Sequence, residues 1–318
     1  MSASRPPGAT LEPLHHVVAA QQFDRDRLSA LFQLSAEMEK VRASGDGQLL
    51  PGRIMASLFY EPSTRTRLSF EAAMLRLGGH VIGTENARDF SSAIKGETLE
   101  DTVQIVAGYS DCIVLRHSEE GAAARAAEVS PVPIVNAGDG PGQHPTQALL
   151  DLYTIQTELG RLDDLQVVMV GDLAHGRTVH SLAYLLALYR GLQVTLVAPD
   201  RIRMSPGVIE HLRKHGAEVH ESEDLLAAVA QADVVYQTRI QLERFSEPWE
   251  EAEDQRRHFR ITEEVMEHLP RGAIVMHPLP RVGEIDPAVD RDPRAAYFRQ
   301  ARNGVAVRMA VLQMLLAA

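Results

Sequence analysis

The residues best suited to chemistry form a short cluster after an apolar run near residue 60. Residues 63–67 read Ser-Thr-Arg-Thr-Arg between hydrophobic flanks. A helix that begins here presents unpaired backbone N–H groups, and the hydroxyls and the Arg65 guanidinium add donors for an anion. The ordinary alternative is an N-cap serine with solvated arginines, which explains Ser63 but not two threonines and two arginines together. The cluster therefore predicts a phosphate-binding site.

Three more arginines lie at or after the ends of predicted strands: Arg116 ends one strand, and Arg177 and Arg239 follow two others. In open parallel sheets, ligands bind beyond the carboxyl ends of the strands. Taken alone, Arg116 would be an ordinary surface ion pair. Together with Arg65, the three arginines indicate a crevice that holds anionic groups on two walls.

Other reactive side chains have ordinary explanations when they are taken singly. His144 and Gln147 stand at the start of a predicted helix, and a lone histidine is more often a structural hydrogen-bond partner than a catalyst. Lys95 would by default be a solvated lysine in a loop. Cys112 lies inside an apolar strand, where we expect a buried, inert thiol rather than a nucleophile.

Residues 171–178, "GDLAHGRT", resemble a nucleotide-binding P-loop but carry Arg177 where that motif has lysine. Arginine does not replace the compact charge of that lysine, so the substitution weakens a nucleotide-binding interpretation without removing it. No G-x-G-x-x-G pattern occurs, which disfavours a dinucleotide fold.

The elements that must position these residues alternate between apolar strands and helical patterns. This order predicts an α/β fold with two domains, each a parallel sheet flanked by helices. The helix expected after Ser63 carries Leu68, Ala72 and Leu75 on one face. The predicted strands are residues 53–60, 80–84, 111–116 and 132–137 in the first domain, and 165–170, 192–198, 217–221, 232–237 and 272–277 in the second.

Two further helices connect the predicted domains. Residues 145–159 have the apolar spacing of a long linking helix with Pro145 in its first turn. The C-terminal residues 300–318 are too apolar for a free tail, so we expect this helix to return to the first domain. The predicted domains are therefore residues 1–150 with that helix, and residues 151–299.

The bulk composition restricts the function classes. A chain of 318 residues suits two domains, and its formal net charge of -11 disfavours a nucleic-acid partner. One cysteine cannot form an intrachain disulfide, and no apolar run is long enough to span a membrane. The N-terminus lacks the apolar segment of a secretory signal, so we expect a flexible arm on a cytoplasmic protein, with organellar import of a longer precursor left open.

Six ordered motifs make the chain resemble the catalytic chains of the aspartate carbamoyltransferase family, within the aspartate/ornithine carbamoyltransferase superfamily. They span residues 59–285 and read "FYEPSTRTRLSFE", "KGETLEDT", "GDGPGQHPTQALLDLYTI", "GDLAHGRTVHSL", "TRIQLER" and "HPLPRVGEI". The first motif marks carbamoyltransferases in general. Arg177 and Arg239 suit a dicarboxylate acceptor and would not suit the cationic acceptor of the ornithine enzymes.

The resemblance implies the transfer of the carbamoyl group of carbamoyl phosphate to L-aspartate in de novo pyrimidine biosynthesis, without a metal or cofactor. It implies that residues 1–150 bind carbamoyl phosphate and that residues 151–299 bind aspartate. The expected catalytic residues are Arg65, Thr66, Arg116 and His144. The expected carbamoyl phosphate ligands are Ser63, Thr64, Arg65, Thr66, Arg116, His144, Gln147, Leu279 and Pro280.

For aspartate, the resemblance implies binding by Lys95, Arg177, Arg239 and Gln241. It also implies a homotrimer with shared sites, in which Lys95 and Ser91 come from the neighbouring subunit. A regulatory chain or dihydroorotase is a candidate partner. Three alternatives stay open: a carbamoyltransferase for another amino acid, a P-loop-like nucleotide-binding protein, and a non-catalytic subunit.

Overall fold

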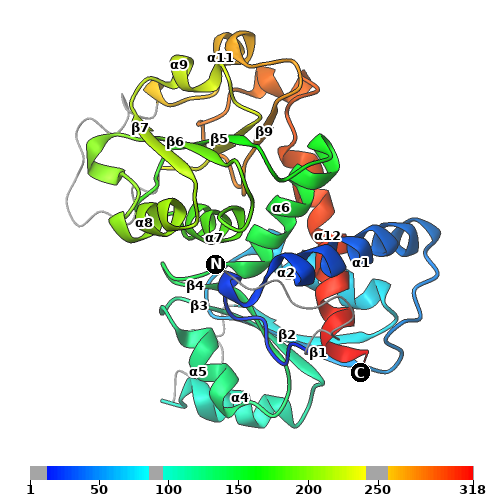
Figure 1. The fold of residues 1–318 in the computed structure, drawn as a ribbon. Coiled ribbons are helices and arrows are strands. Elements are labelled where there is room, and N and C mark those ends of the chain that lie inside the picture. The colour runs from blue at the N-terminus through cyan, green and yellow to red at the C-terminus, as the bar shows by residue number, and fades with distance from the viewer. Residues whose placement is uncertain (1–12, 86–95, 241–256, 318) are drawn as a thin grey trace.

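The computed structural model describes residues 13–85, 96–240 and 257–317. It contains two parallel sheets, one in each half of the chain, with helices on both faces (Figure 1). All nine predicted strands are present, and their bounds differ from the predicted ranges by no more than two residues at either end. The predicted α/β fold class is confirmed.

The first sheet has the strand order β2-β1-β3-β4 and is parallel throughout. Alternate residues of β1 point to opposite faces, and both faces are covered. Met55 packs with α1 and α2, whereas Ala56 packs with α4 and α5. The elements are α1 (Arg25–Ser44), β1 (Ile54–Phe59), α2 (Thr64–Arg76), β2 (His80–Glu85), α4 (Leu99–Ala107), β3 (Cys112–His117), α5 (Ala122–Val129) and β4 (Ile134–Asp139).

The second sheet has the strand order β7-β6-β5-β8-β9 and is also parallel. Val167 of β5 packs with α7 and α8, and its neighbour Val168 packs with α9 and α11. The elements are β5 (Gln166–Val170), α7 (Arg177–Leu186), β6 (Gln193–Val197), α8 (Pro206–Lys214), β7 (Glu218–Ser222), α9 (Leu225–Val229), β8 (Val234–Gln237), α11 (Glu263–His268) and β9 (Ile274–Met276). The described residues also form three short 3-10 helices: η1 (Ala20–Gln22), η3 (Asp200–Ile202) and η5 (Pro287–Arg291).

Two helices tie the halves together: α6 (Pro145–Leu159) and α12 (Tyr297–Leu316). Helix α6 begins with proline at its first position, as predicted, and eleven consecutive residues from Pro145 are buried. Helix α12 leaves the second domain and runs beside α6 to pack on α1 and α2 (Figure 1). The predicted linking helix and the return of the C-terminal helix are confirmed.

Helix α2 buries a different face from the one whose apolar residues stand out in the sequence. Its buried residues include Phe70, Ala73 and Met74, and this face lies against α12. Leu68 and Leu75 are 56% and 59% exposed in the single chain. Both faces have helical spacing, so periodicity alone could not choose between them.

Among the described helices, none has the length and apolar character needed to cross a membrane.

Gly171, which directly follows β5, provides a test of backbone packing. Gly171 has a φ of 112°, and a Cβ atom there would lie 2.1 Å from the carbonyl oxygen of Thr238. We expect Gly171→Ala to lower the free energy of unfolding by more than about 1 kcal/mol, because both the conformation and the space exclude a side chain. Urea unfolding followed by circular dichroism measures this.

Gly207→Ala is the matched control, because no atom lies within 4 Å of the Cβ position in α8. This variant should keep or raise stability, by up to about 1 kcal/mol. Equal unfolding midpoints for the two variants would contradict the packing described here.

Candidate active site

A cavity of about 960 Å³ lies at the carboxyl ends of the strands, with walls from both domains. Its lining includes five arginines and one carboxylate among the described residues. Eleven of the predicted site residues line it: Ser63, Thr64, Arg65, Thr66, Arg116, His144, Gln147, Arg177, Arg239, Leu279 and Pro280. The structure therefore brings together residues separated by more than 200 positions in the sequence.

The first wall is the N-terminus of α2. Ser63 occupies the N-cap position, yet its side chain makes no capping hydrogen bond, so the ordinary capping explanation does not account for it. Thr66 is buried, and partial burial lowers the pKa of Arg65. Arg67 does not line this cavity and instead bonds Glu71 at 2.8 Å. The two arginines of the cluster thus have different surroundings, and only Arg65 faces the cavity.

Arg116 and Arg177 meet across the domains at the carboxylate of Glu61. Glu61 Oε2 lies 2.7 Å from an Arg116 nitrogen and 3.3 Å from an Arg177 nitrogen. Arg116 also donates to the carbonyl of Ala137 at 3.1 Å, and Arg177 donates to the carbonyl of Gly140 at 2.6 Å. Burial and the nearby Arg177 charge lower the pKa of Arg116 to about 10, so it stays cationic at neutral pH.

The close approach of these guanidinium groups depends on Gly138. A Cβ atom at this position would lie 2.9 Å from Arg116 Nη1 and 3.0 Å from Arg177 Cζ, and the φ of Gly138 is 115°. A side chain at residue 138 would therefore push the two arginines apart.

Sequence reasoning missed Glu61 as a functional residue. It stands two positions before Ser63 in the cationic motif, and a lone carboxylate among arginines is a signal that could have been followed. Its partners lie 55 and 116 positions away, so the pairing itself could not be read from the sequence.

His144 and Gln147 occupy the first turn of α6. The backbone N–H of His144 donates to Ser181 Oγ at 3.1 Å, while its Nδ1 atom has no hydrogen-bond partner among the described residues. Burial, followed by the charges of Arg177 and Arg116, holds the pKa of His144 well below its usual range. The imidazole is therefore neutral at neutral pH and can act as a hydrogen-bond donor to an oxygen.

The turn after β9 brings Leu279 and Pro280 to the cavity. His277 is buried and shapes this turn, because its Nδ1 accepts from the backbone N–H of Leu279 at 2.8 Å. Its Nε2 then carries the proton and donates to Glu284 at 2.8 Å. Leu279 has a φ of 47°, a conformation that non-glycine residues adopt rarely.

The P-loop-like segment does not form a separate phosphate site. Gly176, Arg177 and Thr178 line the cavity already described, and the Arg177 side chain reaches across to the first domain. Arg239, which follows β8, lines the same cavity. These positions favour one shared anion site over a nucleotide loop.

Several predicted features lie outside the described residues: Lys95, Ser91, Gln241 and the N-terminal arm as far as residue 12. Cys112 is fully buried in β3, and burial raises the pKa of its thiol to about 12. A thiol of that pKa carries almost no thiolate at neutral pH, so the prediction of an inert cysteine is confirmed.

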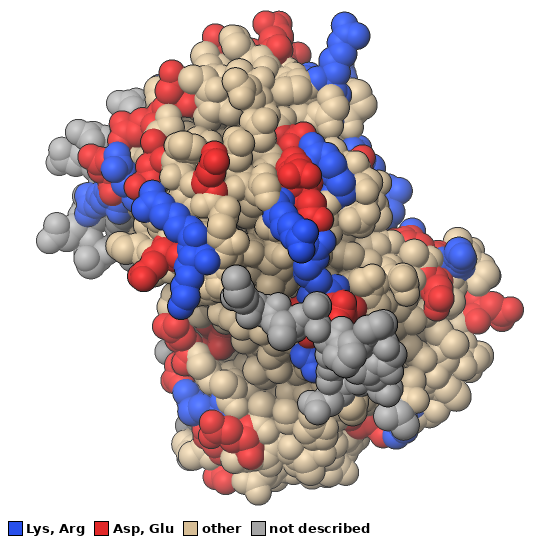
Figure 2. All heavy atoms as spheres, in the orientation of Figure 1, with Lys and Arg blue, Asp and Glu red and all other residues tan. Residues whose placement is uncertain are grey.

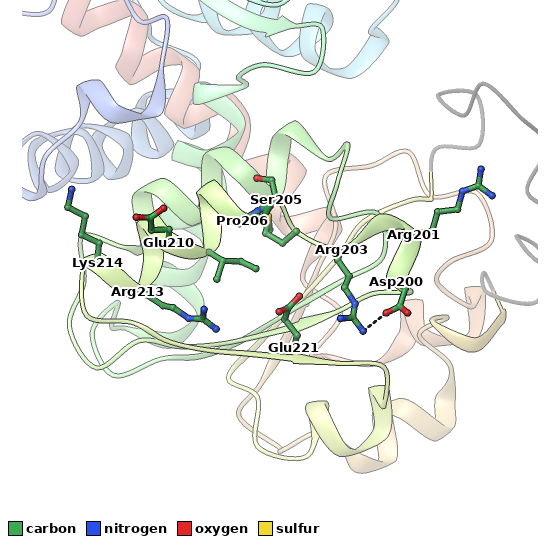
Figure 3. A pocket seen from close by; sticks show the side chains of 11 residues that line it. Asp200, Arg201, Arg203, Ser205, Pro206, Glu210, Arg213, Lys214 and Glu221 are labelled. Atoms are coloured by element: carbon green, nitrogen blue, oxygen red, sulfur yellow. Dashed lines mark ion pairs between the residues drawn. The ribbon is translucent and has the colours of Figure 1, made fainter.

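A second cavity of about 960 Å³ lies in the second domain, between η3, α8 and β7 (Figure 3). None of the predicted site residues lines it. Its charges are mixed, and Arg203 pairs with the carboxylates of Asp200 and Glu223. Acidic and basic side chains are likewise interspersed on the face shown in Figure 2. Of these two cavities, the first is therefore the one whose described lining carries the larger excess of cationic side chains.

Comparison with known proteins agrees with this geometry. A family model described as "Aspartate/ornithine carbamoyltransferase, carbamoyl-P binding domain" matches residues 15–157, and the corresponding Asp/Orn binding domain matches residues 163–315. The chain belongs to the aspartate/ornithine carbamoyltransferase family. Among curated relatives, aspartate carbamoyltransferase 1, chloroplastic, from Pisum sativum is 57% identical, with 95% of this chain and 79% of the relative covered.

Solved structures of this carbamoyltransferase family match the whole fold. The catalytic subunit of M. jannaschii aspartate transcarbamoylase superposes with a TM-score of 0.89 at 46% identity, covering 95% of this chain and 98% of that one. Aspartate transcarbamoylase from Trypanosoma cruzi, in complex with N-(phosphonacetyl)-L-aspartic acid, gives a TM-score of 0.90 at 42% identity, with 96% and 98% covered. The two-domain architecture is thus that of the family.

The position of Glu61 between Arg116 and Arg177 leads to a prediction about the balance of charge in the cavity. Glu61→Gln removes the negative charge that Arg116 and Arg177 share, so we expect the unliganded protein to lose about 1–3 kcal/mol of stability. Inorganic phosphate should restore more of this stability in the variant than it adds to the wild type, because it supplies the missing negative charge. Thermal melts with and without phosphate measure both effects.

Glu71→Gln is the matched control, because it removes the partner of Arg67 on the same helix but outside the cavity. The expected loss is about 0.5 kcal/mol, with no extra recovery by phosphate. Identical phosphate responses for the two variants would contradict the role given to Glu61.

Proposed function

We propose that this chain is an aspartate carbamoyltransferase. The reaction transfers the carbamoyl group of carbamoyl phosphate to the amine of L-aspartate, giving N-carbamoyl-L-aspartate and phosphate for pyrimidine biosynthesis. The observation that carries the proposal is the cavity itself, which is lined by five arginines from both domains and by a single carboxylate among the described lining residues. Such a site suits two anionic substrates held side by side.

Carbamoyl phosphate occupies the first wall. The N-terminal N–H groups of α2 and the side chains of Ser63, Thr64 and Arg65 hold the phosphate, with Thr66 and Arg116 beside them. The helix dipole and the two arginines also stabilise the charge that grows on the departing phosphate. That phosphate accepts the proton of the attacking amine, so the proposed mechanism uses no protein nucleophile.

The carbonyl oxygen gains negative charge as the amine attacks the carbonyl carbon. Thr66, Arg116 and His144 are the donors proposed for this oxygen. A neutral His144 fits the task, because it donates an N–H without adding a third charge to the two arginines beside it. Gln147 and the backbone carbonyls of Leu279 and Pro280 orient the carbamoyl and amine groups, which holds the reacting atoms in line.

Aspartate occupies the second wall, where Arg177 and Arg239 pair with its two carboxylates and Gln241 and Lys95 assist. A guanidinium binds a carboxylate through two parallel hydrogen bonds, so two arginines define both the charge and the length of the acceptor. A cationic acceptor such as ornithine would be repelled. Residues 1–150 with the C-terminal helix are the proposed carbamoyl phosphate domain, and residues 151–299 the proposed aspartate domain.

We expect the purified protein to form carbamoyl aspartate from carbamoyl phosphate and L-aspartate, and to leave L-ornithine uncarbamoylated. In Arg239→Ala, the loss of a carboxylate partner should raise the KM for aspartate about thirtyfold, which corresponds to about 2 kcal/mol. Its affinity for inorganic phosphate should stay within about threefold of the wild type, because the phosphate ligands are unchanged. Colorimetric assay of carbamoyl aspartate and calorimetric titration of phosphate provide the two measurements.

Arg65→Ala is the mirror control on the other wall. It should lower kcat by about a hundredfold and weaken phosphate binding, with a smaller effect on the KM for aspartate. An inactive but folded and oligomeric wild type would refute the proposed function. Equal losses for both substrates in both variants would refute only the division of the cavity into two walls.

The proposed assembly is a homotrimer in which Lys95 and Ser91 reach the site of a neighbouring subunit. The exposed face of α2 supports this proposal, because Leu68, which lines the cavity, and Leu75 are exposed apolar side chains that a neighbour would cover. The proposed compartment is the cytoplasm. The pea relative is named chloroplastic, so a plastid is the alternative, and imaging of a fluorescent fusion to the full-length precursor decides between them.

In the proposed trimer each active site takes residues from two subunits. Two variants that are inactive by themselves should therefore regain activity when their subunits are mixed. Mixing equal amounts of Lys95→Ala and Arg116→Ala subunits, after dissociation and reassembly, should restore about a quarter of wild-type activity, since a quarter of the sites receive two intact contributors. Native mass spectrometry measures whether trimers form and whether the subunits have mixed.

The same measurement on protein from its source, with and without a uridine nucleotide, tests for a bound regulatory chain or dihydroorotase.

The control mixture pairs Arg65→Ala with Arg116→Ala, which belong to the same half of each site. No activity should return, because every site then carries one defect or the other. Mixed trimers without rescue in the first mixture would exclude a catalytic contribution from the neighbouring subunit.

A further inference from the structure

Asp151 is a buried carboxylate that the proposed mechanism does not use. It lies on α6, is fully buried, and is enclosed by side chains of β8 and α12. Its Oδ1 accepts from Gln147 Nε2 at 2.8 Å and from Gln300 Nε2 at 2.6 Å, and its Oδ2 accepts from the Tyr236 hydroxyl at 2.6 Å. One side chain is thus hydrogen-bonded to three parts of the chain.

The contact with Gln300 continues to the turn at the cavity. Gln300 Oε1 accepts from the backbone N–H of His277 at 2.8 Å. His277 in turn fixes the backbone of Leu279 through its Nδ1 atom. Asp151 therefore reaches two cavity-lining groups at once: the side chain of Gln147 directly, and the turn at Leu279 through Gln300 and His277.

We propose that Asp151 is a positioning residue that fixes Gln147 and the turn of residues 277–280 relative to each other. This inference rests on the proposed function, in which these two groups orient the carbamoyl group and the attacking amine. The groups come from elements 130 residues apart, and Asp151 and Gln300 form the hydrogen-bonded connection between them. Asp151 itself does not line the cavity.

The chemistry of the three donors explains why a carboxylate suits this position. An ionised carboxylate only accepts hydrogen bonds, so it can satisfy two amides and one hydroxyl at the same time. Arg308, also buried, lies close enough on α12 to favour the ionised form. Burial opposes ionisation and raises the pKa of Asp151 to about 7, and the donors from Tyr236, Gln300 and Gln147 act in the other direction.

Asparagine can replace this carboxylate in part. Its oxygen can accept from both glutamine amides, and its amide group can face the Tyr236 hydroxyl, which can accept as well as donate. Alanine offers no acceptor, so the side chains of Gln147 and Gln300 lose the group that fixes their direction. The two substitutions therefore separate loss of positioning from loss of charge.

A purely structural role for Asp151 is the competing explanation, and Thr154 provides the control for it. Thr154 lies one turn further along α6, is fully buried, and accepts a hydrogen bond from Asn303 of α12 at 3.1 Å. Thr154→Val therefore removes a buried polar contact between the same two helices without touching Gln147 or Gln300.

The experiment compares Asp151→Ala, Asp151→Asn and Thr154→Val in the full-length oligomer. We expect Asp151→Ala to lower kcat tenfold or more, because a displacement of about 1 Å at the reacting groups can cost up to about a hundredfold. The KM for aspartate and the affinity for inorganic phosphate should stay within about threefold, since the arginines are unchanged. Asp151→Asn should recover kcat to within about threefold, and Thr154→Val should keep wild-type kcat at a lowered melting temperature.

Three results would overturn the inference: unchanged kcat in Asp151→Ala, an equal loss of phosphate affinity and kcat, or the same loss of kcat in Thr154→Val. If Asp151→Ala does not fold, Gln300→Met breaks the connection while retaining Asp151. It should also lower kcat, and unchanged kcat there would overturn the inference as well. A wild type that forms no carbamoyl aspartate would refute the proposed function, whereas an active wild type with any of these results refutes the positioning role alone.

Discussion

The structure must offset the electrostatic repulsion between the guanidinium groups that it gathers into one cavity. Arg116 and Arg177 are each 9% exposed, and both are held at the carboxylate of Glu61. Backbone carbonyls of Ala137 and Gly140 accept further hydrogen bonds from the two arginines and help to hold these cations in place. A second counter-ion would neutralise the charge that attracts anions. The Glu61 carboxylate offsets only part of the positive charge of the two arginines. The site therefore stays cationic, while their repulsion is reduced in the folded protein.

The same requirement explains why the site lies between two domains. Each sheet delivers arginines at the carboxyl ends of its strands, and neither domain alone supplies both walls. Helix α6 joins the sheets through a continuous apolar core, so the two sets of charges are held by one packed body. Electrostatic repulsion between the walls is thus opposed by hydrophobic packing behind them.

Much of the fold and most of the described site could be predicted from the sequence, because the relevant signals are local. Apolar runs locate each strand, and a polar residue that follows a strand must lie at the sheet edge where ligands bind. The pairing of Glu61 and the connections of Asp151 could not be predicted in this way. Asp151 meets Tyr236 and Gln300 at separations of 85 and 149 residues, which no local pattern encodes. The buried face of α2 could not be predicted for another reason. Both faces of this helix carry apolar residues at helical spacing, so either face could have been buried.

The path of α12 has a consequence for how the protein is made. This helix packs on α1 and α2, yet it is the last described element of the chain. During synthesis, the apolar face of α2 that includes Phe70 and Met74 lacks its contacts with α12 until more than 200 further residues have left the ribosome. The first domain to be translated is therefore the last to be completed. A chain released early would expose that face, which makes premature termination a source of aggregation rather than of a functional half-enzyme.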